Sequence, residues 1–137
     1  MLSASENRFS HLLATRPWLL ADGATGSNLF DVGLVSGDAP ELWNTEHPDR
    51  IAALHQSFVD AGADILLTNS FGGTVYRLKL HNAQGRMAEL NTLAAQRGRF
   101  MTSASVGSNA STSASAIELT MLTHRICAGA IGSATPI

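Results

Sequence analysis

The sequence predicts an α/β fold built on a parallel sheet. Two short apolar runs, residues 18–21 and 63–68, each pass into a polar, glycine-rich segment. This is typical of buried parallel strands that end in loops. Between them, residues 48–61 carry apolar side chains at helical spacing. The order strand, helix, strand predicts a right-handed βαβ unit, in which polar groups gather at the carboxyl ends of the strands.

The helix expected over residues 48–61 has clear signals at both ends. Pro48 suits a first helical turn, Asp49 suits the positive end of the helix dipole, and Gly62 suits the position just after a helix. Its apolar stripe consists of Ile51, Leu54, Phe58 and Ala61. The spacing of three and four residues places this stripe on one side of the helix, where it can cover a sheet.

Three other segments have weaker helical patterns. Residues 5–14 form a short pattern before Pro17, and a helical turn is expected around residues 28–32 within a long loop. Residues 75–96 are helical in pattern, and Gly85 is expected to divide them. We therefore expect a helical extension over residues 1–17, followed by the α/β region.

Composition and charge exclude several classes of protein. The chain has 137 residues, of which 45% are apolar and 15% are charged, and its formal net charge is −2. This balance favours a folded protein and gives no electrostatic reason to expect nucleic acid or a membrane surface as partner. Cys127 is the single cysteine, so no internal disulfide can form. A cytoplasmic location is expected from these features.

Polar residues follow both predicted strands. Asp22 and Gly23 follow the first strand, and Thr68 and Asn69 follow the second. A carboxylate at the first strand exit can hold an ammonium group or a metal, although an Asp-Gly pair is also an ordinary turn. The hydroxyl and amide groups at the second exit can bind a polar substrate. For His55, on the central helix, a hydrogen-bonded structural role is expected rather than metal ligation.

Residues 18–97 resemble the start of the homocysteine S-methyltransferase family, which includes the homocysteine-binding domain of methionine synthase and betaine–homocysteine methyltransferase. The resemblance is carried by the segments LLADGATGSNLF and ELWNTEHPDRIAALHQSFVDAGADILLTNSFGG. It implies that the chain contains the first two βα units of a (β/α)8 TIM barrel, incomplete, with an irregular tail over residues 98–137. It also implies methyl transfer to the homocysteine sulfur, which gives methionine.

The same resemblance implies roles for particular residues. Asp22 and Gly23 are expected to hold the substrate amino group, while Thr68 and Asn69 line the same pocket. The methyl donor in this family is methyltetrahydrofolate on cobalamin, betaine or S-methylmethionine. The family also uses zinc held by three cysteines, and Cys127 matches none of them. None of the family's zinc ligands can therefore be assigned to a residue of this chain, and we expect the isolated chain to be inactive.

Two alternatives remain open at this point. Residues 98–137 are rich in Ser, Ala, Thr and Gly, which leads to the hypothesis that the reading frame shifted near residues 96–100. The first alternative to methyl transfer is a non-catalytic interaction fragment that pairs its open sheet edges with another chain. The second alternative, a small nucleotide-binding domain, depends only on the glycine-rich residues 23–28.

Overall fold

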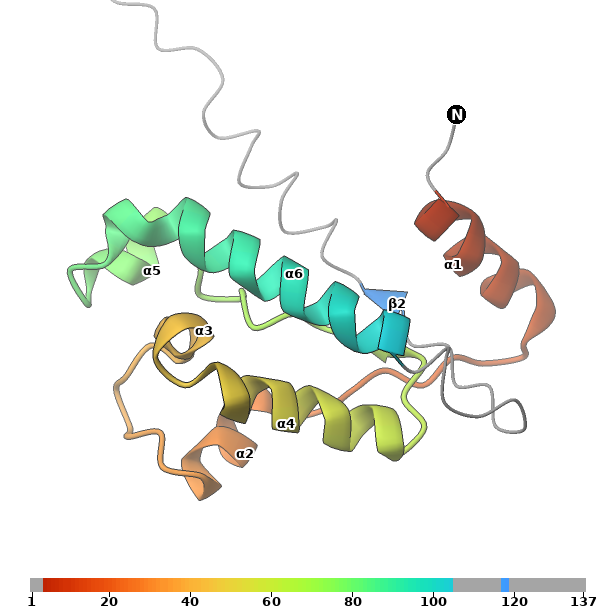
Figure 1. The fold of residues 1–137 in the computed structure, drawn as a ribbon, viewed down its shortest axis with the longest axis horizontal. Helices are drawn as coiled ribbons and strands as arrows, with labels where there is room; N and C mark the ends of the chain where they lie inside the picture. The colour runs from red at the N-terminus through yellow and green to blue at the C-terminus, as the bar shows by residue number, and fades with distance from the viewer. Residues whose placement is uncertain (1–3, 105–116, 119–137) are drawn as a thin grey trace, which may run out of the picture.

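A computed structural model describes residues 4–104 and 117–118, and this part of the chain is mostly helical. In chain order its helical elements are α1 (Ala4–Thr15), α2 (Thr25–Asp31), the 3₁₀ turn η1 (Pro40–Leu42), α3 (Trp43–Glu46), α4 (Pro48–Asp60), α5 (Val75–Lys79), the 3₁₀ turn η2 (Gln84–Arg86) and α6 (Met87–Ala104) (Figure 1). The two strands within these ranges are β1 (Ile65–Leu66) and β2 (Ile117–Glu118). No helix in the described ranges is long and apolar enough to cross a membrane.

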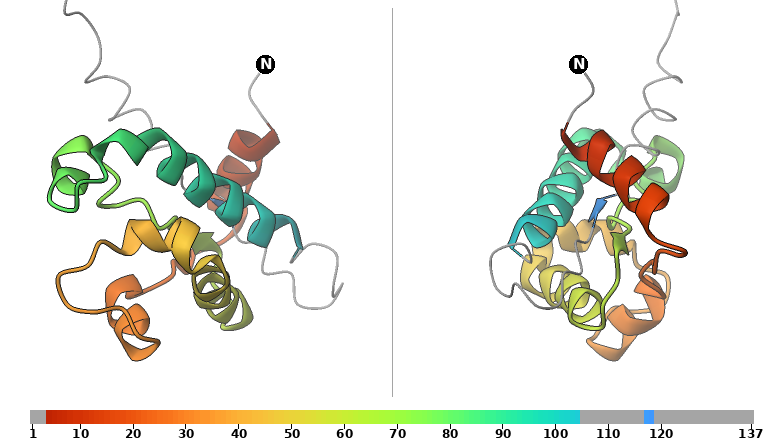
Figure 2. Two further views of the ribbon diagram at one scale, coloured as in Figure 1. Left: turned by 60° about the vertical axis from the view of Figure 1, so that its left-hand side comes forward. Right: turned by 90° about the vertical axis from the view of Figure 1, so that its right-hand side faces the viewer.

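Helix α4 forms as its sequence predicts. Pro48 occupies its first turn, and Gly62 follows its end with a φ of 92°, a value that glycine adopts without strain. Ile51 and Leu54 of the predicted stripe are buried. Helix α6 lies beside α4, as the two views of Figure 2 also show. The pair forms the main layer of the described structure.

Three apolar clusters hold the helices together. The first connects α2 to α3 and α4, the second connects the end of α4 to β1 and α6, and the third connects α5 to α6. Their buried members are Leu29, Leu34, Trp43, Ile51 and Leu54 in the first, Val59, Ala63, Leu66 and Met101 in the second, and Leu78, Ala83 and Leu90 in the third. Burial of these side chains is the main stabilising contribution to the fold.

The predicted α/β class, with two βα units of a TIM barrel, is wrong for this structure. Each strand has only two residues, and the first predicted strand contributes one isolated bridge, between Ala21 and Ile65. The reason is visible in the hydrogen bonds. Asp64 N and Ile65 N both donate to the single carbonyl of Leu20, so the regular ladder of a sheet does not continue.

The contacts that do form are parallel, with Ile65 opposite Ile117 and Leu66 opposite Glu118. Apolar side chains along these extended segments stay exposed, including those of Trp18, Leu20 and Leu67. Hydrogen bonding between such short strands contributes little stability, because isolated strand pairs are marginal in water. Helices therefore dominate the described structure.

The other helical predictions are confirmed, with shifted boundaries. Helix α1 covers the pattern of residues 5–14, and α2 begins earlier than the turn expected around residues 28–32. The region of residues 75–96 is divided near Gly85, as predicted, although α6 continues through residue 104. Of the predicted irregular tail, residues 98–104 are helical as part of α6 and residues 117–118 form β2, while the other tail residues lie outside the described ranges.

Candidate functional site

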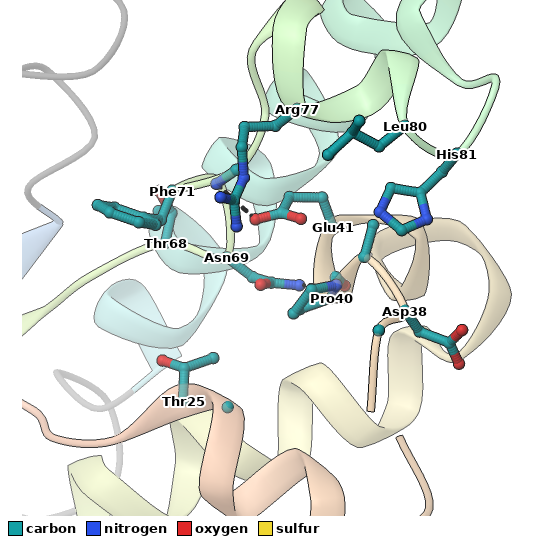
Figure 3. Close-up of a pocket in the computed structure, with 14 residues that line it drawn as sticks. Thr25, Asp38, Pro40, Glu41, Thr68, Asn69, Phe71, Arg77, Leu80 and His81 are labelled. Carbon is teal, nitrogen blue, oxygen red and sulfur yellow. Dashed lines mark hydrogen bonds between the residues drawn. The ribbon is translucent and has the colours of Figure 1, made fainter. Parts of the chain in front are cut away.

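A pocket of about 490 Å³ lies where four segments of the chain meet (Figure 3). These segments are the start of α2, the loop that leads into η1, the loop after β1, and the end of α5 with its following turn. The lining residues are Thr25, Gly26, Gly37, Asp38, Ala39, Pro40, Glu41, Thr68, Asn69, Phe71, Gly72, Arg77, Leu80 and His81. A pocket of this size can enclose a small organic molecule.

The two residues predicted after the second strand both line this pocket. Thr68 Oγ1 lies 2.8 Å from the hydroxyl oxygen of Ser70. Asn69 is buried, and its Nδ2 donates to Pro40 O at 2.8 Å and to Asn44 Oδ1 at 3.1 Å. Asn44 Nδ2 in turn donates to the backbone carbonyl of Asn69 at 2.8 Å, so the two residues are bonded in both directions. The Asn69 nitrogen therefore positions the pocket wall, while its oxygen is the atom available to a ligand.

Glu41 fixes the loop that carries Phe71 and Gly72. Its side chain is only 5% exposed, and its Oε1 accepts a hydrogen bond from Gly72 N at 2.6 Å. This bond joins η1 to the loop after β1. Sequence reasoning did not select Glu41, because a single acidic residue within a short 3₁₀ turn carries no pattern that marks a site.

Asp22 and Gly23 lie beside this region but are not among the lining residues. Asp22 Oδ2 accepts from Leu67 N at 2.9 Å, directly before Thr68, while its Oδ1 is buried and has no hydrogen-bond partner in the described part of the chain. Burial raises the pKa of this carboxyl above its ordinary value, although the hydrogen bond from Leu67 N opposes the shift. Gly23 packs next to the ring of Phe58.

His55 is part of the protein interior and not of the pocket. It is 2% exposed, and neither ring nitrogen has a hydrogen-bond partner within residues 4–104 and 117–118. His55 lies on α4 as expected, whereas the expected hydrogen bond is not found among the described residues. Burial, together with the positive charge of Arg97, lowers the pKa of His55 to about 4.

The described residues do not supply a donor set for zinc. No group of three His, Cys, Asp or Glu side chains within residues 4–104 and 117–118 is arranged to hold a metal ion. Cys127 lies outside the described residues. A structural zinc site needs four ligands and a catalytic site usually three, so this part of the chain does not fit the metal.

Gly73 follows the pocket loop at a close approach to α6. A Cβ atom at this position would collide with Asn91 Oδ1 and lie 3.0 Å from Ser70 O. Gly73→Ala should therefore lower the free energy of unfolding by about 2 kcal/mol, because the loop or α6 must shift. Chemical denaturation measures this change. Gly85→Ala is the control, since a Cβ there meets nothing within 4 Å; equal losses in both variants would contradict the expectation.

The pocket, with hydroxyl, amide, carboxylate and guanidinium groups on its walls, is of the kind that binds a small polar molecule. Comparison with known proteins is consistent with this class. The family model described as homocysteine S-methyltransferase matches residues 19–136. The chain belongs to this family. The matched range continues into the Ser- and Ala-rich segment after residue 97.

Two related proteins have similar sequences over part of the chain. Methionine synthase of Mycobacterium leprae is 30% identical over 86 residues, which cover 58% of this chain and 7% of that protein. Methionine synthase of Mycobacterium tuberculosis is 29% identical over 79 residues, which cover 53% of this chain and 7% of that protein. The matched part is thus a small fraction of either relative.

Proposed function

We propose that the pocket binds homocysteine, and that the chain contributes this binding to methyl transfer onto the homocysteine sulfur, giving methionine. Membership of the family supports the substrate. The observation that carries the proposal is the convergence of residues 25–26 and 68–69 on one cavity, because these are the two glycine-rich exits that the sequence selected. A cytoplasmic location belongs to the same proposal.

Each predicted residue has a role in this proposal. Asp22 supplies negative charge for the substrate ammonium group, which requires its covered Oδ1 to become accessible when the substrate enters. Gly23 has no side chain, which lets the turn after Asp22 pack close to the ring of Phe58. Thr68 offers its hydroxyl group and Asn69 its free amide oxygen to the polar end of the amino acid. We derive no step through zinc, because the described residues do not fit that metal.

Asp22→Asn tests the proposal with little change in structure. The variant keeps an acceptor for Leu67 N but removes the charge, so we expect homocysteine to bind about tenfold more weakly. Isothermal titration of reduced L-homocysteine into the chain measures this affinity. Asp31→Asn, an exposed position at the end of α2, is the matched control. An unmodified chain that binds no homocysteine, or equal affinities in both variants, would refute the proposal.

A further inference from the structure

Two side chains of the pocket that donate hydrogen bonds from nitrogen come from one short segment. Arg77 lies in α5 and His81 in the turn that follows, and both line the cavity. The two side chains approach the same cavity from the end of α5 and from the turn directly after it. The fully buried Leu78 packs against α6, and Thr74 caps α5 by accepting from Arg77 N at 3.3 Å. The backbone that carries both side chains is therefore held in place.

Arg77 faces the cavity without a protein partner. Its guanidinium group forms no hydrogen bond or ion pair within the described part of the chain, and Figure 3 shows it directed into the space beside Asn69 and Glu41. Glu41 already accepts the hydrogen bond from Gly72 N. The carboxylate of Asp38 points away from the other labelled side chains (Figure 3). Within the described residues, neither lining carboxylate forms an ion pair with Arg77, so its guanidinium N–H groups are available to a ligand.

A guanidinium group in this position favours a planar anion. Its paired N–H groups match the two oxygens of a carboxylate, and such charge-assisted pairs are among the stronger hydrogen bonds in proteins. Thr68 and Asn69, on the neighbouring wall, provide a hydroxyl group and an amide for the rest of a small polar ligand. The arrangement suits an amino acid whose carboxylate is free.

We propose that Arg77, with His81 beside it, binds the α-carboxylate of the substrate and so selects a free α-amino acid. This inference depends on the proposed binding of homocysteine and adds the residue that recognises one end of it. Because Arg77 is exposed, part of the attraction is screened by solvent, which places the expected effect at the lower end of the range for charged hydrogen bonds.

The test compares two ligands and two variants. Reduced L-homocysteine and its methyl ester, which lacks the negative charge, are each titrated calorimetrically into the unmodified chain, Arg77→Gln and Lys79→Gln. We expect the unmodified chain to bind homocysteine about tenfold more tightly than the ester. Arg77→Gln should bind both ligands with the same weak affinity. Lys79 is exposed on the same helix but does not line the pocket, so Lys79→Gln should behave like the unmodified chain.

The outcomes separate this inference from the proposed function. If homocysteine binds equally well to Arg77→Gln and to the unmodified chain, the carboxylate site is wrong while homocysteine binding stands. If the unmodified chain binds no homocysteine, both proposals fail. Arg77→Lys provides a second variant in case Arg77→Gln does not fold. It keeps the charge without the planar group, so an intermediate preference for homocysteine over the ester supports the site, and an unchanged preference contradicts it.

Discussion

Replacing Asp64 by alanine should lower the free energy of unfolding by about 3 kcal/mol. Asp64 is 2% exposed, and its two oxygens accept hydrogen bonds from Arg16 Nη1 and Leu20 N. Removing the carboxylate leaves a partly buried N–H group and a partly buried cation without this partner, and loss of one member of a buried ion pair is strongly destabilising. The expected loss of stability lies at the lower end of the range for broken buried ion pairs, because the Arg16 side chain is 33% exposed.

Urea denaturation followed by circular dichroism measures this loss. Asp31→Ala, an exposed aspartate at the end of α2, is the matched control and should change stability by less than about 0.5 kcal/mol. Asp64→Asn should fall between the two, since the amide oxygen can still accept from Leu20 N. If Asp64→Ala is as stable as Asp31→Ala, the junction between α1 and the Leu20 segment contributes nothing to the fold.

Acid should destabilise the protein through His55. The pKa of His55 is about 4 in the folded chain and near 6.5 when unfolded, so between these values only the unfolded chain takes up the proton. Stability contributed by the neutral imidazole is therefore complete above pH 6.5 and is lost as pH falls toward 4. The difference between the folded and unfolded pKa of His55 corresponds to about 3 kcal/mol in the free energy of unfolding. Asp22, whose pKa is raised, acts in the opposite direction, because its folded form gains a proton more easily.

Thermal unfolding between pH 4.5 and 7.5 isolates the histidine contribution. His55→Leu should flatten the pH dependence, and it should not lower stability at pH 7.5, because it also removes two buried nitrogens without partners. The same substitution at His11, which is exposed on α1, should leave the slope unchanged. A slope that survives in His55→Leu would mean that other groups cause the acid sensitivity.

The helices could be predicted from the sequence because their signals are local. The stripe, proline and glycine of α4 act within one segment, and the structure follows them. Strands depend on partners that are distant in sequence. Residues 63–68 have the composition of a buried strand, yet β1 contains only Ile65 and Leu66 because pairing with the Leu20 segment is irregular. No feature of either run alone reveals that the ladder will stop.

In the candidate site, too, residues marked by a local sequence pattern could be predicted, and residues that act through distant contacts could not. Thr68 and Asn69 were found because polar residues after an apolar run are visible in the sequence, and both line the pocket. Arg77 and His81 were missed, although their spacing of four on a predicted helix was a signal that could have indicated a shared surface. Glu41 could not have been found in this way, since its role depends on Gly72, which is 31 residues away.

The paired amides of Asn44 and Asn69 have a consequence for how the pocket tolerates change. Asn44 also donates to Leu90 O at 3.3 Å, so the pocket wall is fastened to α6 by directional bonds. Apolar cores accept many side chains of similar volume, whereas a bond between two amides depends on which atom donates and which accepts. Sequence drift among the buried leucines can therefore leave the binding wall unchanged, while a single exchange of amide for carboxylate at residue 44 would turn a donor into a second acceptor.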